Sequence, residues 1–280
     1  MEDLDYDGYL DAYVRMDGLN ASFTSRDCGQ MTSLEFKKNN LNLINTIARR
    51  KEAYHKAFFN EEDKATDTEA SSQEGISTIH DFNVELTDEM KDMLVYDWYN
   101  KNSFVDHVVT EFDQKKFVDC AFHELSDFTN SPADIKSGKS TLSFSRNGGI
   151  YLDGKHNSQI VKKYEFVDNG INFEIQLNTD CPCNLVYVLE MNFHFWDMEN
   201  ISINSEKSGN INKGASFKIT DGLSAEIEIT FEQTQEVFSS VFSTVSQSEK
   251  GVDLTAQGVS LFIPISFSKK LSLKGRLEVN

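Results

Sequence analysis

The stretch from Ile76 to Val109 contains the residues of this sequence that are best suited to acid–base chemistry. It holds His80 and His107, and each of these histidines is next to an aspartate, Asp81 or Asp106. A histidine beside an acid can accept and donate protons near neutral pH. Neighbouring residues of a strand point to opposite faces, however, so neither sequence pair is a ready-made dyad.

Glu190 offers a carboxylate that could complete such a site across a sheet. It lies in the long apolar stretch 185–195, where Asn192 is expected to point the same way. Two hypotheses remain open. The polar residues form a satisfied network inside the fold, because an unpaired buried polar group costs about 1–3 kcal/mol. Alternatively, Glu190 acts with His80 or His107 as the acid–base pair of a sugar site.

Aromatic residues near these groups could bind the apolar face of a sugar ring, to which flat aromatic surfaces are suited. Most of the 21 phenylalanines are expected in the core. Trp196, which closely follows the apolar stretch, is a weaker candidate than Trp98. The candidate substrate-binding residues are Trp98, Tyr99, Tyr54, His55 and His107.

Motifs of several common active sites are absent from the sequence. No HExxH or paired CxxC pattern indicates zinc, and no GxSxG pattern indicates a serine nucleophile. Asn147-Gly148-Gly149 lacks the Lys-Ser/Thr of a phosphate-binding loop and is expected to be a turn. No EF-hand loop is recognised, so no calcium ligands are assigned. We expect neither a metal nor another cofactor.

The charge balance excludes two classes of partner. The chain has 45 acidic and 27 basic residues, for a net charge of -18. A nucleic-acid-binding protein needs a basic surface for the phosphates, and an anionic membrane surface would repel this chain. A neutral sugar remains compatible because it does not feel the net charge.

Cysteine usage and hydropathy predict a cytoplasmic protein. Cys28 and Cys120 are isolated, and Cys181-Pro-Cys183 is spaced too closely for the usual CxxC patterns. Reduced thiols are typical of the cytosol. No run of about 18 apolar residues indicates a transmembrane helix, and the acidic start MEDLDYDGYL is not that of a signal peptide.

Alternation of apolar and polar residues predicts an all-β fold. The expected strands are residues 9–15, 19–24, 31–36, 104–110, 141–144, 159–167, 171–177, 185–195, 225–231, 237–245, 259–267 and 271–279. Asp17-Gly18 and Asp168-Asn169-Gly170 are hairpin signals. Many short strands with frequent turns predict one domain, residues 1–280, built as a large antiparallel sandwich.

Short helices and one loop are expected between the strands. The spacing of Leu41, Ile44, Ile47 and Ala48 predicts a short helix. Acids at the start of residues 88–94 favour one or two further helical turns. Residues 60–75 are polar and acidic without aromatics, which predicts a mobile loop.

A series of short motifs runs through the chain in order. The motifs are DYDGY at 5–9, NLI at 42–44, ARRKEAYH at 48–55, ISTIHD at 76–81, YDWY at 96–99, SFVDH at 103–107, ELSDF at 124–128, TVSQSEKG at 244–251 and QG at 257–258. In this order they resemble the C-terminal β-domain of 4-α-glucanotransferases and α-amylases of glycoside hydrolase family 57. The resemblance implies a super-sandwich of two large antiparallel sheets, similar to galactose mutarotase.

The resemblance also implies a function. In such enzymes the catalytic carboxylates lie in an N-terminal (β/α) barrel, so no catalytic residue is transferred to this chain, which starts where the β-domain starts. The leading hypothesis is a non-catalytic domain of an enzyme that acts on α-1,4-glucans. It would pack on the catalytic barrel and bind maltooligosaccharide.

Charged residues of these motifs are expected to brace the fold. Arg49 and Arg50 could form bidentate pairs with Asp81, Asp97 or Asp106. The expected structural network consists of Arg49, Arg50, Asp81, Asp97, Asp106, Gln247 and Glu249.

Two other functions remain open. One is a stand-alone mutarotase-like epimerase that uses His80 or His107 with Glu190, and the other is a structural interaction module without a ligand. An epimerase needs its His and Glu close together on a solvent-open concave face, whereas a domain separated from a barrel should expose an apolar patch.

Overall fold

Antiparallel strands make up most of the chain. The computed structural model describes residues 1–58, 91, 94–248 and 251–280. Its strands are β1 (Asp11–Arg15), β2 (Leu19–Thr24), β3 (Gln30–Phe36), β4 (Leu41–Asn42), β5 (Val105–Val109), β6 (Asp134–Ser137), β7 (Thr141–Tyr151), β8 (Lys155–Val167), β9 (Gly170–Thr179), β10 (Leu185–Phe193), β11 (Ser202–Ile203), β12 (Glu206–Lys207), β13 (Ile211–Thr220), β14 (Glu226–Ser248), β15 (Gly251–Phe267) and β16 (Lys270–Val279). Short helical segments are η1 (Lys37–Asn39), η2 (Ala53–Phe58) and α2 (Gln114–Val118). The predicted all-β class is confirmed.

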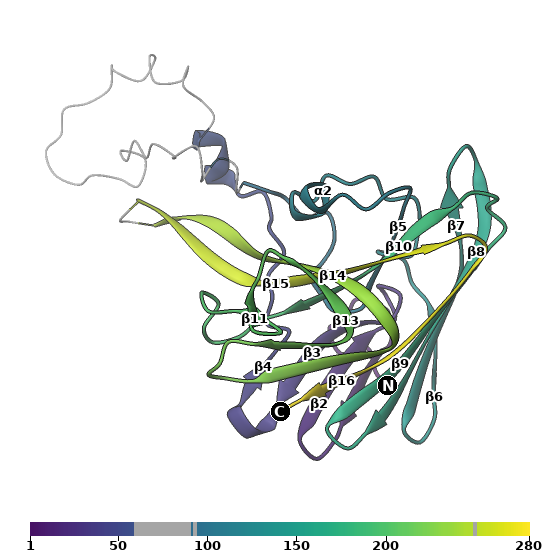
Figure 1. Cartoon of the computed structure of the whole chain (residues 1–280), viewed down its shortest axis with the longest axis horizontal. Coiled ribbons are helices and arrows are strands. Elements are labelled where there is room, and N and C mark those ends of the chain that lie inside the picture. Colours follow the sequence, from purple (N-terminus) through teal and green to yellow (C-terminus); the bar gives the residue numbers. More distant parts are fainter. Residues whose placement is uncertain (59–90, 92–93, 249–250) are drawn as a thin grey trace, which may run out of the picture.

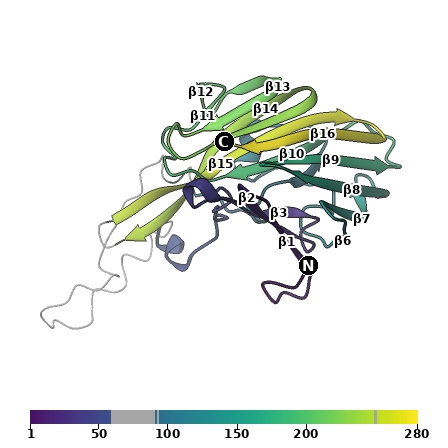
Figure 2. The ribbon, with the colours of Figure 1, turned by 90° about the horizontal axis from the view of Figure 1, so that it is seen from below.

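The strands form a small and a large sheet around one main core (Figures 1 and 2). The small sheet has the order β1-β2-β3-β4. The large sheet runs β12-β11-β13-β14-β16-β9-β8-β7-β6, and β15, β10 and β5 continue it from β14. Across the core, the ring of Tyr164 on β8 contacts Phe23 of β2 and Phe104 just before β5, at centroid distances of 4.6 and 5.1 Å. The β1–β4 sheet and β5 therefore face β7–β9, which confirms the predicted super-sandwich.

Strand β14 belongs to both sides of this sandwich. Its first part, Ile227 to Phe231, pairs with β16, and its later part, from Phe238 onward, pairs with β15. The sequence predicted two strands here, because polar residues separate the two apolar stretches. In the structure β13 pairs with both stretches, Ser216 with Thr230 and Gly214 with Gln235, across an irregularity in which residues 231–234 have no partner on β13, and the two stretches form one strand. Beyond this, β14 and β15 project as a hairpin away from the sandwich (Figures 1 and 2).

The predicted helix at residues 41–48 is wrong. Leu41 and Asn42 form β4 on the edge of the small sheet. The side chain of Asn42 accepts hydrogen bonds from the backbone N–H groups of Leu34 and Ile44, at 3.1 and 3.0 Å. Asparagine competes in this way with helical hydrogen bonds. Ile47, a position of the proposed apolar stripe, is exposed.

The predicted turn at residues 147–149 is also wrong, because these residues lie inside β7. Their glycines allow the side chain of Asp127 to approach the strand closely and do not reverse the direction of the chain. A Cβ on Gly148 would lie 2.1 Å from Oδ1 of Asp127, and that same carboxylate accepts the N–H of Gly149 at 3.0 Å. By contrast, the hairpins predicted at Asp17-Gly18 and at residues 168–170 are confirmed.

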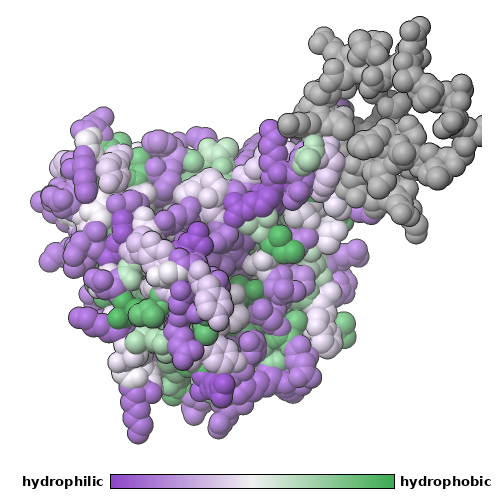
Figure 3. Space-filling view, turned by 180° about the vertical axis from the view of Figure 1, so that it is seen from behind, coloured by the Kyte–Doolittle hydropathy of each residue, from purple (hydrophilic) through white to green (hydrophobic). Residues whose placement is uncertain are grey.

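Some predictions fall outside the described residues, namely the acidic loop 60–75 and most of the helical turns at 88–94. Within the part of the chain that is described, no helix has both the length and the apolarity needed to cross a membrane. Figure 3 shows the back of the molecule, where hydrophilic residues dominate and hydrophobic ones form small separate groups.

Candidate functional site

Strands β5 and β10 hold the candidate residues. They are antiparallel, and their register pairs Glu190 with Val105 and His107 with Val188. Since side chains alternate along a strand, Glu190 and His107 share one face and Asp106 takes the other. On the face of Glu190 the strands carry a second, smaller apolar cluster, to which the following segment contributes Phe117 and other rings.

Glu190 is completely buried and its carboxylate is saturated with hydrogen bonds. It accepts from Tyr99 Oη at 2.6 Å, Lys101 Nζ at 2.9 Å, Asn192 Nδ2 at 2.9 Å and His107 Nε2 at 3.1 Å. A carboxylate has about four acceptor positions. Burial by itself would raise the pKa of Glu190, but Lys101 and His107 together hold it well below the usual range. Glu190 is therefore an anion with no acceptor position left for a substrate.

His107 lies between two carboxylates. Its Nδ1 is 2.8 Å from Oε2 of Glu124, and its Nε2 is 3.1 Å from Glu190. Both ring nitrogens can donate only when the imidazole is protonated. Burial opposes that charge, yet the hydrogen bonds to Glu124 and Glu190 raise the pKa of His107 to about 9. At neutral pH the residue is an imidazolium and does not act as a base.

A second buried pair adjoins this centre. Arg49 donates to Asp97 from Nε at 3.0 Å and from Nη2 at 2.7 Å, which is bidentate geometry. Burial opposes ionisation of Asp97, but Arg49 and Lys101 lower its pKa. The Lys101 ammonium lies 3.6 Å from Asp97 and 2.9 Å from Glu190, so it joins the two pairs. Arg50 instead donates to the backbone oxygen of Asp97 at 3.1 Å.

The network is balanced in charge. Its anions are Asp97, Glu124 and Glu190, and its cations are Arg49, Lys101 and protonated His107. Buried charges are stable only when they are paired and hydrogen-bonded. The arrangement therefore braces the segments before and after β5, residues 94–104 and 110–130, against β5 and β10. Lys101 was not singled out in the sequence, and Glu124 appeared there only as part of the ELSDF motif, because nothing local to either residue indicates which strand it meets.

Asp106 does not pair with Arg49 or Arg50 as the sequence suggested. It points to the opposite face of β5, where Lys162 Nζ of β8 lies 2.5 Å from its Oδ2 and Tyr187 donates to its Oδ1 at 2.7 Å. Lys162 and Asp106 are both completely buried and link the two sides of the main core. Strand alternation explains the difference, since Asp106 and His107 cannot share a face.

The candidate aromatic residues differ in their exposure. Trp98 is 41 % exposed, and its ring lies above the network, with its centroid 6.2 Å from that of His107. Tyr99 and His107 are buried inside the network, and buried His55 lies with Nε2 3.1 Å from the backbone oxygen of Val245. A ring without an exposed face cannot stack on a sugar. Among these candidates, Trp98 and the partly buried Tyr54 keep accessible surface.

Several motif residues line a small cleft of about 210 Å³. Arg49, Arg50, Tyr54 and His55 form one side of it, and Gln257 of β15 contributes to the other. The remaining predicted residues, His80, Asp81 and Glu249 together with the side chain of Gln247, lie outside the described residues.

The sequence profile of one protein family matches residues 3–277. It describes the C-terminal part of alpha-amylases and 4-alpha-glucanotransferases. The chain belongs to this family. Members with curated descriptions include a 4-alpha-glucanotransferase of Thermococcus litoralis, 27% identical over 282 residues, and an alpha-amylase of Pyrococcus furiosus, 25% identical over 282 residues. Both matches cover 99% of this chain but only 40% and 39% of the relatives, so the chain spans about two fifths of their length.

Solved structures show the same fold. The crystal structure of the Thermococcus litoralis 4-alpha-glucanotransferase matches with a TM-score of 0.81 and 23% identity. The match covers 99% of the present chain and 38% of the glucanotransferase chain. A galactose mutarotase-like protein of Lactobacillus casei matches with a TM-score of 0.53 and 8% identity, over 97% of this chain and all of the other. At this identity the likeness concerns the fold alone.

One group of acids was not recognised in the sequence. Carboxylate oxygens of Asp3, Asp5 and Asp11 lie within 4.8 Å of one another, the only such group among the described residues. The acids at every second position before Gly8 were the available signal. Asp3 accepts the N–H groups of Asp7 and Gly8, so hydrogen bonds within the loop already use part of this oxygen set. We assign no ion to it.

Proposed function

We propose that this chain is the non-catalytic C-terminal β-sandwich of a cytoplasmic 4-α-glucanotransferase or α-amylase of glycoside hydrolase family 57. In this role it packs against a catalytic (β/α) barrel and binds maltooligosaccharide. Membership of the family and the coverage of about two fifths of each relative support this assignment.

The saturated state of Glu190 carries the non-catalytic part of the proposal. An epimerase would need a free base and a free acid that reach the sugar. Here Glu190 accepts four hydrogen bonds and His107 is held as a cation between two carboxylates. Neither side chain has exposed surface. The pair predicted as an alternative catalytic centre is thus committed to bracing the fold.

Exposed apolar residues at the start of the chain support packing against a partner. Six of the large exposed hydrophobic residues lie within the first 13 positions. They are Met1, Leu4, Tyr6, Tyr9, Leu10 and Tyr13. They share one short segment of the chain, and exposed apolar surface that gathers in this way is typical of an interface. Because the matching family describes a C-terminal part, the catalytic portion of the parent enzyme would approach from this end.

Titration calorimetry with maltoheptaose tests glucan binding, with glucose and galactose as controls. We expect micromolar to millimolar affinity for maltoheptaose. Trp98→Ala should weaken it roughly threefold to tenfold, the range for the loss of one aromatic contact. Trp196→Ala is the matched control, since Trp196 is 60 % exposed and its backbone N–H donates to Ser224 rather than to a residue of the network. Failure of all three sugars to bind would refute the binding role.

Polarimetry tests the absence of epimerase activity. Freshly dissolved α-D-glucose or α-D-galactose should mutarotate at the same rate with and without the protein. An acceleration that disappears in Glu190→Gln would contradict the proposal and establish the epimerase alternative.

A further inference from the structure

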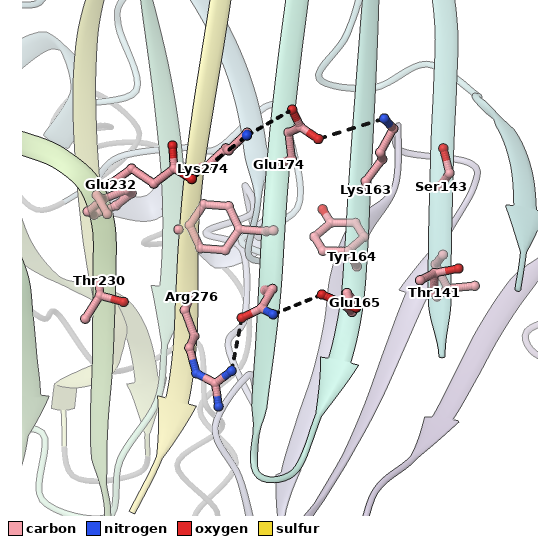
Figure 4. A pocket seen from close by; sticks show the side chains of 15 residues that line it. Thr141, Ser143, Lys163, Tyr164, Glu165, Glu174, Thr230, Glu232, Lys274 and Arg276 are labelled. Atoms are coloured by element: carbon pink, nitrogen blue, oxygen red, sulfur yellow. Dashed lines mark hydrogen bonds and ion pairs between the residues drawn. The ribbon is translucent and has the colours of Figure 1, made fainter. Parts of the chain in front are cut away.

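A groove of about 660 Å³ lies on the large sheet (Figure 4), and none of its lining residues belongs to the network of Glu190. The groove crosses β7, β8, β9, β16 and β14. With strands about 4.8 Å apart, five strands give a groove about 19 Å long. This volume lies within the range of about 300–1,000 Å³ that is usual for ligand sites.

Two parallel rows of polar side chains form the walls of the groove. Cross-strand pairing aligns one row as Ser143, Lys163, Glu174, Lys274 and Glu232, and the other as Thr141, Glu165, Asn172, Arg276 and Thr230. Figure 4 shows both rows projecting from the strands. The residues between the rows, such as Phe173 and Phe231, point their rings to the core, so the backbone of these residues forms the floor of the groove. Gly275 lies beside Phe173 in this floor, and on its core side a Cβ would lie 2.5 Å from the Phe173 ring.

The two walls differ in how far their polar groups are satisfied. In the second row, Asn172 donates to Glu165 at 3.1 Å and accepts from Arg276 at 3.1 Å. In the first row, Glu174 accepts one hydrogen bond, from Gln176 Nε2 at 2.7 Å, whereas its distances to the ammonium groups of Lys163 and Lys274 are 3.8 and 4.0 Å. These last two distances are too long for hydrogen bonds. The ammonium groups of the first row and most of its carboxylate acceptor positions therefore remain available to a ligand. In the second row, Glu165, Asn172 and Arg276 are hydrogen-bonded to one another.

The charges along the groove cancel. Its cations are Lys163, Lys274 and Arg276, and its anions are Glu165, Glu174 and Glu232. An ionic ligand would gain little from such a lining, but alternating donors and acceptors match the hydroxyl groups of a neutral sugar. A protein partner is disfavoured, because the centres of protein interfaces are depleted of charge and rich in exposed aromatics.

We propose that this groove is a second α-glucan site, in which Lys274 and Glu174 bind neighbouring hydroxyl groups of the oligosaccharide. This inference rests on the proposed function for the class of ligand, but it concerns a different surface from that of Trp98. The groove residues lie on β7–β9, β14 and β16, whereas Trp98 lies over β5 and β10.

Nuclear magnetic resonance of the ¹⁵N-labelled chain titrated with maltoheptaose separates the two surfaces. The backbone amides of Lys163, Glu174 and Lys274 report on the groove, and the indole N–H of Trp98 reports on the other surface. We expect both sets of signals to shift, each with its own binding curve. In Glu174→Gln and in Lys274→Met, the affinity measured from the groove signals should fall about tenfold, as for loss of a hydrogen bond to a charged group. The affinity measured from the Trp98 indole should stay unchanged.

Glu236→Gln is the matched control, because Glu236 forms an exposed pair with Lys213 at 3.0 Å outside the groove. It should leave both curves unchanged. Shifts confined to the Trp98 indole would overturn the groove site and leave the proposed function standing. Groove shifts that are the same in Glu174→Gln, Lys274→Met and the control would overturn the assigned hydroxyl contacts. No shift at either surface would refute glucan binding by both.

Discussion

The imidazolium of His107 makes the stability of this domain depend on pH in a defined window. Its pKa is raised from 6.5 to about 9 in the folded chain, because Glu124 and Glu190 bind both ring nitrogens against the opposing effect of burial. One pKa unit corresponds to about 1.4 kcal/mol. The shift therefore contributes about 3 kcal/mol to the free energy of unfolding.

The sign follows from the direction of the shift. The folded state binds the proton more tightly, so the contribution is fully present below about pH 6.5, the value of an unfolded histidine. It decreases as the pH rises and is lost above about pH 9, the folded pKa. We expect the free energy of unfolding to fall by about 3 kcal/mol across this window.

Urea unfolding followed by tryptophan fluorescence measures this dependence. Profiles from pH 6 to 9.5 are compared for the native chain and His107→Gln, which keeps a hydrogen-bonding side chain but cannot titrate. The variant should be less stable at pH 6 and should lack the decrease. Buried Cys28 and Cys120, with pKa values raised to about 12 and 11 mainly by burial, are present in both chains, so their effect cancels in the difference. Identical profiles for the two proteins would refute the reasoning.

Three further outcomes are expected. Asp97→Asn should lower the free energy of unfolding by roughly 3–5 kcal/mol in urea titrations, because it leaves buried Arg49 without its anion. Lys162→Met should cost a similar amount, and adding Asp106→Leu should restore much of it in a double-mutant cycle, since the uncompensated buried charge is then removed. Ellman's reagent should react with one thiol of the native chain, that of Cys183, and with all four after denaturation, since the other three are buried.

Each of these outcomes can fail in its own way. The exposed pair at Lys213 provides the control for the buried pairs, because Lys213→Met should change stability by less than about 1 kcal/mol. Equal losses for Asp97→Asn and this control would show that burial adds nothing. A cycle at Lys162 without recovery would mean that the methionine itself does not fit, and more than one reactive native thiol would contradict the burial of the other cysteines.

The strand pattern was predictable because alternation reports directly on a half-buried sheet. The register of β8 with β9 follows from the Asp168-Asn169-Gly170 signal between them. Sequence reasoning failed where tertiary contact overrides local preference. Leu41 was predicted to be helical, but it pairs with the edge of the small sheet. Gly148 was predicted to lie in a turn, but it lies inside a strand, where the lack of a side chain makes room for Asp127.

The candidate site was predictable in part. Glu190, His107, Arg49 and Asp97 were all singled out as polar residues in apolar or motif surroundings, and the structure brings them together through Lys101. The identity of each partner depends on which strands meet and which face each residue takes. Alternation alone already separated Asp106 from His107, but only the packing of β8 across the core reveals Lys162 as the partner of Asp106.

Strand β16 determines when the two halves of the large sheet can join during synthesis of the chain. It lies between β14 and β9 and, among the described strands, is the only link from β14 to the β9–β8–β7–β6 half of the large sheet. During synthesis residues 270–279 leave the ribosome after all the strands that they join. Until then the two halves expose open strand edges, which readily pair with other chains. The large sheet can therefore close only after residues 270–279 have left the ribosome, and a ribosome that stalls before Lys270 releases a chain prone to aggregate.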